Sequence, residues 1–424
     1  MRTTIFSQIV GIVLMLLLGS GLQLSAQNNE SFFTVSGVVK DSHTNKKLNY
    51  VNVTVPGTNI GTVTNADGEF TLKIKYALHA KEVEFSHLGY LNYRFEVSGD
   101  VVGTTILLAP SAKLLQEITV RPDNPHQLVA QAIDRIGDNY SKTQTLFSAF
   151  YRETVQKGKR YIQVAEAVID VYKSRYDESI GRDRVRIFKG RKLLAPQKND
   201  TLAVKLMGGP YFAVLLDVVK NPDILLDKET LSMYDFTMED PVSINNRLQY
   251  VISFKPAVTV PYALYYGRYY IDRETLAFTQ IAFNLDMSDL NKATEVMLVK
   301  KPAGLHFKPY EFSFLVTYKQ QNGVSYLNYI RSDASFKCDW KRRLFSSKYN
   351  VVSEMVMTDR EDQGVKPFPF KESFTKNEAF SDKVSAFFDP DFWGAYNIIE
   401  PTESLDAAVT KLKKAALTNS KIQK

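Results

Sequence analysis

The chain has 424 residues, of which 44% are hydrophobic and 23% are charged, ordinary proportions for a globular protein with room for about two or three domains. The formal net charge of +7 is spread along the chain, and the dense basic clusters are only Lys341–Arg343 and Lys411–Lys414. Nucleic-acid-binding proteins concentrate Lys and Arg on one face or in a recognisable module. This sequence has no such concentration, so we expect no nucleic-acid partner.

Residues 1–26 have the pattern of a secretory signal peptide. Arg2 precedes the apolar run Ile9–Leu18, and Leu24-Ser25-Ala26 supplies the small residues of a cleavage site before Gln27. The apolar run is too short for a membrane-spanning helix. We therefore expect cleavage near Ala26, export to the periplasm or the outer membrane, and no transmembrane segment in the mature chain.

Residues 33–109 consist of short alternating runs separated by turn residues. Phe33–Asp41 and Tyr50–Val55 alternate with strand periodicity, and further runs follow up to Leu108, enough for a β-sandwich. Asn65-Ala-Asp-Gly68 predicts a tight hairpin turn, because Asp-Gly readily adopts positive φ. The stretch therefore predicts a small β-sandwich domain at 33–109.

An ordered set of residues in this stretch matches a known family: Ser36–Val39, Val53, Gly57-Thr58, Gly61-Thr62, Thr64-Asn65, Asp67–Phe70, Phe85 and Leu88–Tyr90. The set resembles the carboxypeptidase regulatory-like domain, an immunoglobulin- or transthyretin-like sandwich of exported proteins in Gram-negative bacteria. The resemblance implies a non-catalytic accessory module. It implies no peptidase activity.

Residues 110–126 contain Pro110, Pro122 and Pro125 and predict a linker with one extended segment at Leu115–Val120. That segment resembles the strand that follows the same module in TonB-dependent receptors. The remaining residues lack the repeated, uniform alternation that a large outer-membrane barrel needs. The chain is therefore not expected to be such a receptor.

Residues 127–424 predict a larger β-rich domain with helices near 127–138 and 402–417. Apolar residues recur at helical spacing in both segments. Residues 174–200 are polar and basic and predict a loop with one short strand at 185–188. The clearest hairpin pairs residues 310–318 with 324–331 around Asn322-Gly323.

The fold class is thus mainly β: an N-terminal sandwich followed by an α+β domain with a curved antiparallel sheet. Gly267–Asp272 and the strand after it resemble the strand pairs of lipoprotein-carrier half-barrels, which implies a half-barrel-like shape. The order of elements, with Phe150-Tyr-Arg-Glu153 and Asp391-Phe-Trp393, resembles exported proteins that carry the regulatory-like module.

Two patterns resemble metal sites. His79-Ala-Lys-Glu82 has the H-x-x-E spacing of zinc carboxypeptidases, but no histidine lies between His126 and His306 to supply a third ligand. Asn65, Asp67 and Glu69 could begin a calcium loop, but the next ligand positions fall in a strand. We expect no metal and no cofactor.

Patterns for covalent or acid–base catalysis are equally incomplete. Ser373-Phe-Thr-Lys376 matches S-x-x-K, but neither S-D-N nor K-T-G follows in order. Asp389 and Asp391 form a carboxylate pair that means little without a known separation in space. The single cysteine, Cys338, excludes an intramolecular disulfide and lies in a strand-like run, where a partly buried small residue is expected. The sequence assigns no catalytic residue and identifies no binding residue.

Aromatic residues offer two further candidates. Phe387-Phe388, Phe392-Trp393 and Tyr396 form a dense cluster that we expect to pack on the sheet. The tyrosines between Tyr262 and Tyr270 fall on both faces of one strand, so some of them should lie outside the main core. An exposed patch there would be a binding-site candidate.

These observations favour a non-catalytic, exported accessory or binding protein. Its partner would be an outer-membrane protein or an apolar ligand, bound by the C-terminal domain. Two alternatives stay open. One is an unrecognised hydrolase that acts on peptide or glycan, and the other is a subunit associated with TonB-dependent receptors or with signalling.

Overall fold

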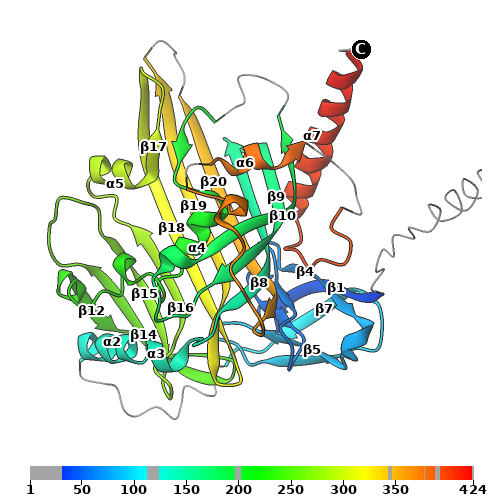
Figure 1. The fold of residues 1–424 in the computed structure, drawn as a ribbon, viewed down its shortest axis with the longest axis vertical. Helices are drawn as coiled ribbons and strands as arrows, with labels where there is room; N and C mark the ends of the chain where they lie inside the picture. Colours follow the sequence, from blue (N-terminus) through cyan, green and yellow to red (C-terminus); the bar gives the residue numbers. More distant parts are fainter. Residues whose placement is uncertain are drawn as a thin grey trace, which may run out of the picture.

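The computed structural model describes residues 31–111, 124–195, 202–341, 346–376, 378–386 and 392–422. The predicted signal peptide and the extended segment Leu115–Val120 lie outside these residues. The described part of the chain confirms the predicted fold class. It is mainly β, with a small N-terminal sandwich beside a larger α+β domain (Figure 1).

Two sheets form the sandwich. The first contains β1 (Phe32–Asp41), β4 (Glu69–Lys75) and β7 (Val101–Leu108). The second contains β2 (Asn52–Thr54), β3 (Gly61–Val63), β5 (Glu82–Ser86) and β6 (Tyr93–Glu96). Alternate residues point between the sheets, for example Phe70, Leu72 and Ile74 of β4, because side chains of a strand alternate between its faces. β1 and β7 are parallel and close together, and a Cβ on Gly37 would lie 2.0 Å from the carbonyl oxygen of Thr104.

The turn at Asn65–Gly68 forms as predicted, but its role differs from the prediction. The side-chain oxygen of Asn65 accepts hydrogen bonds from the backbone N–H groups of Asp67 and Glu69, both at 2.9 Å, and Gly68 has φ +72°. However, β3 and β4 belong to different sheets. The turn is therefore a corner between the two sheets rather than a hairpin.

Within the described residues, the large domain contains one sheet of 12 strands. In spatial order its strands are β12 (Tyr234–Met238), β14 (Arg247–Pro256), β15 (Tyr265–Asp272), β16 (Phe278–Leu285), β18 (Leu305–Gln321), β19 (Val324–Trp340), β20 (Ser347–Glu361), β8 (Thr145–Lys157), β9 (Arg160–Lys173), β10 (Arg184–Leu194) and β21 (Ser385–Ala386), with β13 (Val242–Ile244) paired to β14. Neighbours are antiparallel except β10 and β21. The sheet is curved and does not close. A separate pair is formed by β11 (Lys205–Leu206) and β17 (Leu298–Lys300).

Two predictions, one of a hairpin and one of a loop, can be compared with the strands of the sheet. The hairpin around Asn322-Gly323 is confirmed: both residues have positive φ, 52° and 80°, and β18 and β19 extend along it for 17 residues each. The prediction for residues 174–200 is confirmed in part: residues 174–183 contain no strand, but the short strand predicted at 185–188 is the longer β10, which ends at Leu194 and has a bulge between Ile187 and Lys189. Two arginines of β10 pair with β9 rather than lying in solvent, since Arg186 bonds Asp170 and Arg191 bonds Glu166.

The helices flank the sheet, and all of those described except α7 are short. They are α2 (Pro125–Asp134), α3 (Ile136–Asn139), α4 (Gly209–Leu215), α5 (Leu290–Met297), α6 (Phe380–Lys383) and α7 (Glu403–Ile422), with 3₁₀ turns η1 (Tyr76–Leu78), η3 (Ile180–Arg182), η5 (Pro222–Ile224), η6 (Leu231–Met233) and η7 (Phe370–Glu372). The side chain of Asn124 caps α2 by accepting from the N–H of Gln127 at 3.0 Å. None of the helices in the described ranges is long and apolar enough to cross a membrane.

One face of the large sheet carries the main hydrophobic core. Residues of α2, α4 and the segment after α4 pack against inward-facing residues of the strands, including the fully buried Tyr269, Phe278 and Val316. Figure 1 shows α4 lying across this face. The concave side of the curved sheet is therefore filled with the protein's own side chains.

The opposite face of the sheet is covered by the sandwich and by residues 392–401, here called the strap. Phe392 and Trp393 of the strap pack with Phe150 of β8 and Val63 of the sandwich, and the Phe150 and Trp393 rings meet edge to face at 5.4 Å. This confirms the expected packing of Phe392 and Trp393 on the sheet, whereas Phe387 and Phe388 lie outside the described residues.

Hydrogen bonds hold the strap to the sandwich along its length. The hydroxyl of Thr62 donates to the carbonyl of Ile398 at 2.8 Å. The side chain of Asn397 accepts from the N–H of Lys73 at 2.7 Å and donates to the carbonyl of the same residue at 3.0 Å, in the way a neighbouring strand would. The strap thus lies between the two domains and bonds to both.

Phe150-Tyr-Arg-Glu153 explains how the sheet holds the strap. Arg152 is buried and donates to Glu166 at 2.8 Å and to the strap carbonyl of Ile399 at 2.8 Å. Tyr151, on the opposite face, meets Phe380 at 4.9 Å, and its hydroxyl donates to Glu153 at 3.2 Å. The motif therefore makes contacts on both faces of the sheet, with the strap through Arg152 and with Phe380 through Tyr151.

We predict that Arg152→Ala lowers the free energy of unfolding by about 3–5 kcal/mol, because it leaves the buried carboxylate of Glu166 with Arg191 as its remaining cation. Denaturant unfolding of the purified protein measures this change. Arg135→Ala is the matched control, since its ion pair with Asp138 is exposed and contributes little. Equal effects of the two substitutions would contradict this role of Arg152.

Candidate functional site

A cavity of about 840 Å³ lies at the margin of the large sheet, where β10 begins. We call it the β10 pocket. The start of β10 and the turn before it form one wall, and residues 367–376 form the other. Phe374 holds the two walls together, because its N–H donates to the carbonyl of Val185 at 2.7 Å. The guanidinium of Arg184 also donates to the carbonyl of Phe368.

Aromatic side chains line the apolar part of this pocket: Tyr172, Tyr211, Phe370 and Phe374. Phe374 is buried and packs against Phe380 and over the backbone of Gly209. Phe370 is 71% exposed. A phenylalanine left in solvent beside a cavity is a feature of ligand and partner sites rather than of a core.

Charged side chains line the rest of the pocket. Arg182, Arg184 and Lys376 are basic, and Glu178 and Asp183 are acidic. Both acidic groups are already paired: Glu178 bonds Arg182 at 2.9 Å, and Asp183 bonds two lysines. The unneutralised charge of the lining is therefore positive.

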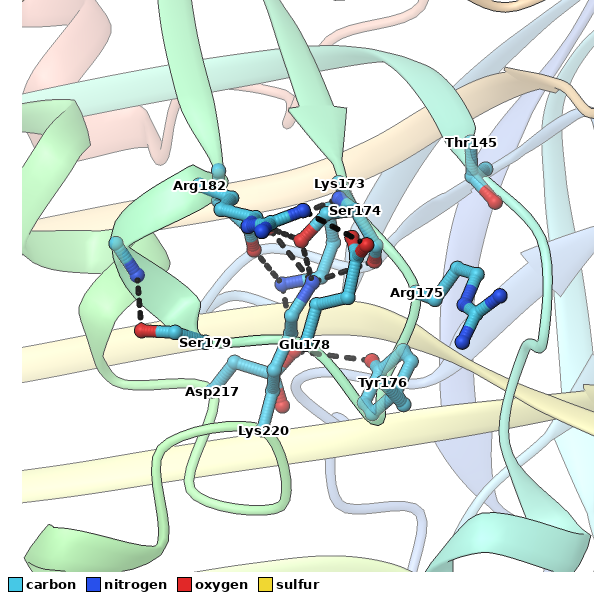
Figure 2. A network of polar contacts seen from close by, with 12 residues as sticks. Thr145, Lys173, Ser174, Arg175, Tyr176, Glu178, Ser179, Arg182, Asp217 and Lys220 are labelled. Carbon is cyan, nitrogen blue, oxygen red and sulfur yellow. Dashed lines mark hydrogen bonds and ion pairs between the residues drawn. The ribbon is translucent and has the colours of Figure 1, made fainter.

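Asp183 also belongs to a buried network of charges with Lys173, Asp217 and Lys220, three residues that are labelled in Figure 2. The ammonium of Lys173 lies 2.9 Å from Asp183 and 2.7 Å from Asp217, and that of Lys220 lies 2.6 Å from Asp183. All four side chains are at most 2% exposed. Two cations face two anions, so the network is neutral as a whole, which is the condition for burying such groups.

Neutral groups complete the network. The hydroxyls of Tyr176 and Tyr318 donate to Asp217 at 2.9 and 2.8 Å. The N–H and hydroxyl of Ser174 donate to Asp183 at 2.9 and 3.0 Å, and Lys220 donates to Ser174. Burial raises the pKa of both tyrosines well above the usual value, so they stay neutral donors.

The surroundings of the two lysines of the network shift their pKa values in opposite directions. Burial acts to lower the pKa of Lys173, but the charges of Asp183 and Asp217 outweigh it and the pKa is raised. Burial and the charge of Lys173 together lower the pKa of Lys220. With their hydrogen bonds satisfied inside the protein, these groups hold the end of β9, the start of β10 and the segment after α4 together, and so fix the shape of the pocket.

The S-x-x-K pair predicted from the sequence lies at this pocket. Ser373 and Lys376 both line it, and the Ser373 hydroxyl donates to the carbonyl of Pro369 at 3.4 Å. Residues three apart face each other on a helix. The backbone at Ser373 is extended, with φ −82° and ψ 140°, so the spacing does not by itself bring the hydroxyl and the ammonium together.

The other sequence candidates do not converge. His79 lies on an exposed turn, and Glu82 is paired with Arg94 at 2.8 Å. Among the residues that the structure describes, no three His, Cys, Asp or Glu side chains are grouped to hold a metal ion. Cys338 is buried in β19, and burial raises the pKa of its thiol to about 11, which disfavours the reactive thiolate. Asp389 and Asp391 lie outside the described residues.

The tyrosines of β15 divide between the faces of the sheet as the sequence predicted. Tyr269 is fully buried and stacks on Phe254 at 4.5 Å, whereas Tyr266 is 46% exposed. The residues that sequence reasoning missed are those of the buried network and of the pocket's basic rim. The only local signal for them was the density of Arg and Lys between residues 174 and 200.

Comparison with known proteins identifies the N-terminal module. Residues 35–120 match the family model of the CarboxypepD_reg-like domain, which confirms the resemblance found in the sequence. No curated protein matches the chain.

Two solved structures share a distant likeness with the chain. A DUF1329 family protein from Desulfovibrio piger is 10% identical, with 57% of this chain and 95% of that chain covered and a TM-score of 0.23. A structure concerned with lipid–protein interactions in lipovitellin is 6% identical, with 55% of this chain and 27% of that chain covered and a TM-score of 0.27. At these TM-scores neither likeness bears on the fold or the function.

We predict that Asp217→Ala destabilises the protein by about 3–5 kcal/mol, because it removes a counter-charge from the buried ammonium of Lys173 and leaves two tyrosine hydroxyls without their acceptor. Denaturant unfolding measures the loss. Asp177→Ala serves as the control, since Asp177 pairs with Arg175 in solvent. An Asp217→Ala protein as stable as the control would show that the network does not hold the pocket walls.

Proposed function

We propose that this chain is an exported, non-catalytic binding protein whose β10 pocket takes a small amphipathic molecule with an apolar body and an acidic end. The observation that carries the proposal is the composition of the pocket, with aromatic side chains on one part of its lining and unneutralised basic groups on another. A lining with one aromatic part and one basic part favours a ligand that has an apolar part and an acidic part.

The aromatic residues supply the apolar part of the site. Phe374 is fixed by its bond to β10, whereas Phe370 is largely exposed. Covering Phe370 with an apolar ligand would remove its ring from water, which is worth about 1.5–3 kcal/mol for a complete side chain. This gives an apolar ligand a reason to bind there.

The charges select the acidic end. Glu178 and Asp183 are held by Arg182 and by two buried lysines, so neither carboxylate is available to a cationic ligand. Arg184 and Lys376 remain beside the aromatic wall. A carboxylate or sulfonate placed between them would gain charge-assisted hydrogen bonds.

The dimensions of the pocket suit a small molecule. Its volume of about 840 Å³ falls within the range of about 300–1,000 Å³ typical of ligand pockets. The concave face of the large sheet is occupied by the main core instead. The proposed ligand therefore binds at the edge of the sheet. A half-barrel carrier would instead hold its ligand inside the curve of the sheet.

We predict that decanoate and the fluorescent anion 1-anilinonaphthalene-8-sulfonate compete for the pocket, and that Phe370→Ser weakens both by about tenfold, or about 1.4 kcal/mol. Fluorescence titration measures the affinities. Phe188→Ser is the matched control, because Phe188 is also more than half exposed but does not line the pocket. Equal weakening by both substitutions, or no competition between the two ligands, would overturn the proposed site.

Export is part of the same proposal, supported by the pattern of residues 1–26 and by the regulatory-like module that follows. We predict that the full chain, expressed in a Gram-negative host, is recovered from the cell envelope with Gln27 as its first residue. Intact-mass spectrometry of the purified protein measures this. A cytoplasmic product that retains residues 1–26 would contradict export.

A further inference from the structure

A second cavity, of about 370 Å³, lies where the sandwich meets the large sheet, and we call it the seam pocket. The two domains bond to each other beside it: the N–H of Gly89 donates to the carbonyl of Ser243 at 2.7 Å, and the N–H of Asn92 donates to the side chain of Asn246 at 2.9 Å. Its lining comes from both domains and consists mainly of amide, hydroxyl and charged side chains. It is therefore a polar site that exists only when the sandwich is docked.

Some charged groups of the seam pocket form ion pairs with other residues that the structure describes, and one does not. Arg94 pairs with Glu84 at 2.9 Å, and Arg247 pairs with Asp272 at 2.7 Å, so both acidic groups of the lining are bonded to arginines. The side-chain ammonium of Lys319, on β18, makes no hydrogen bond or ion pair within the described residues. The two arginines also pair with Glu82 and Glu274 outside the lining, so Lys319 is the cation of the lining that lacks a paired carboxylate in the described part of the chain.

Two further polar atoms in the lining are buried without a hydrogen-bond partner among the described residues. They are the Nε of Arg247, a donor, and the side-chain oxygen of Asn92, an acceptor. Leaving a buried polar group unbonded costs about 1–3 kcal/mol. A ligand that accepts from Lys319 and Arg247 and donates to Asn92 would satisfy all three groups.

We propose that the seam pocket binds a small hydroxylated carboxylate, such as a sugar acid, with its carboxylate at Lys319 and Arg247 and a hydroxyl at Asn92. The volume admits a molecule of that size, and the polar lining disfavours an apolar chain. Because Asn92 belongs to the sandwich and Lys319 to the large sheet, the bound molecule would link the two domains. This site is distinct from the β10 pocket and does not depend on the function proposed for it.

The pH dependence of binding follows from the surroundings of Lys319. Burial lowers its pKa to about 8, an effect increased by Arg360 of β20 and opposed by Glu84 of β5. The other charged groups of the lining are Arg94, Arg247 and Asp272. The carboxylate needs the protonated ammonium, so its affinity should be nearly constant below about pH 7 and fall by about tenfold between pH 7 and pH 9.

The test is isothermal titration calorimetry of the full mature chain with D-glucuronate and with its uncharged counterpart D-glucose. We expect glucuronate to bind at least tenfold more tightly than glucose at pH 7. Lys319→Gln should reduce that affinity at least tenfold and abolish its change between pH 7 and pH 9. Lys300→Gln is the control, because Lys300 is exposed on β17 and does not line the seam pocket.

The thermal unfolding of Lys319→Gln in the absence of ligand separates a binding role from a structural one. Lys319 makes no bond that the substitution would break, so its midpoint should equal that of the unaltered protein. The proposal is overturned if glucose binds as tightly as glucuronate, or if Lys319→Gln leaves the affinity and its pH dependence unchanged. It is also overturned if the loss of affinity is accompanied by a lowered unfolding midpoint.

Discussion

The arrangement of the two domains depends on one buried arginine. Arg152 crosses from β8 to the strap, where it donates to the carbonyl of Ile399 while Glu166 neutralises its charge. A guanidinium with its planar fork of donors can serve a carboxylate and a backbone carbonyl at the same time, which a lysine cannot do in fixed geometry. The strap in turn provides the surface on which the sandwich lies. The rings of Phe392 and Trp393, which pack on both the sheet and the sandwich, reinforce this contact.

The large sheet uses its two faces in different ways. Its concave face carries the core, so the curve of the sheet encloses the protein's own side chains. Its outer face is covered by the strap and the sandwich. Both cavities with ligand-like chemistry therefore lie at boundaries, one beside β10 and the other between the domains. Ligand pockets commonly lie at domain interfaces and at other places where neighbouring elements leave space between them.

Patterns of neighbouring residues in the sequence predicted hairpins, turns and strands, which contacts between neighbouring residues determine. The hairpin around Asn322-Gly323, the tight turn at Asn65 and the strand that contains Cys338 all follow from residues close in the chain. The buried network could not be predicted in the same way. Asp217 meets Tyr318 across 101 positions, and no periodicity marks such a pair. For the same reason the strand predicted at 185–188 was too short, because Arg186 and Arg191 of β10 are neutralised by Asp170 and Glu166 of β9.

The strap also has a consequence for the order in which the protein forms. The sandwich residue Thr62 bonds Ile398, 336 positions away, whereas the contacts inside the sandwich join residues of a single short stretch. Domains near the start of a chain generally fold first during synthesis. The sandwich can therefore complete its own sheets early, but its bonds to the strap must wait until residues 392–401 have left the ribosome. A chain truncated before the strap would keep only the direct bonds between the domains, such as those of Gly89 to Ser243 and of Asn59 to Arg360.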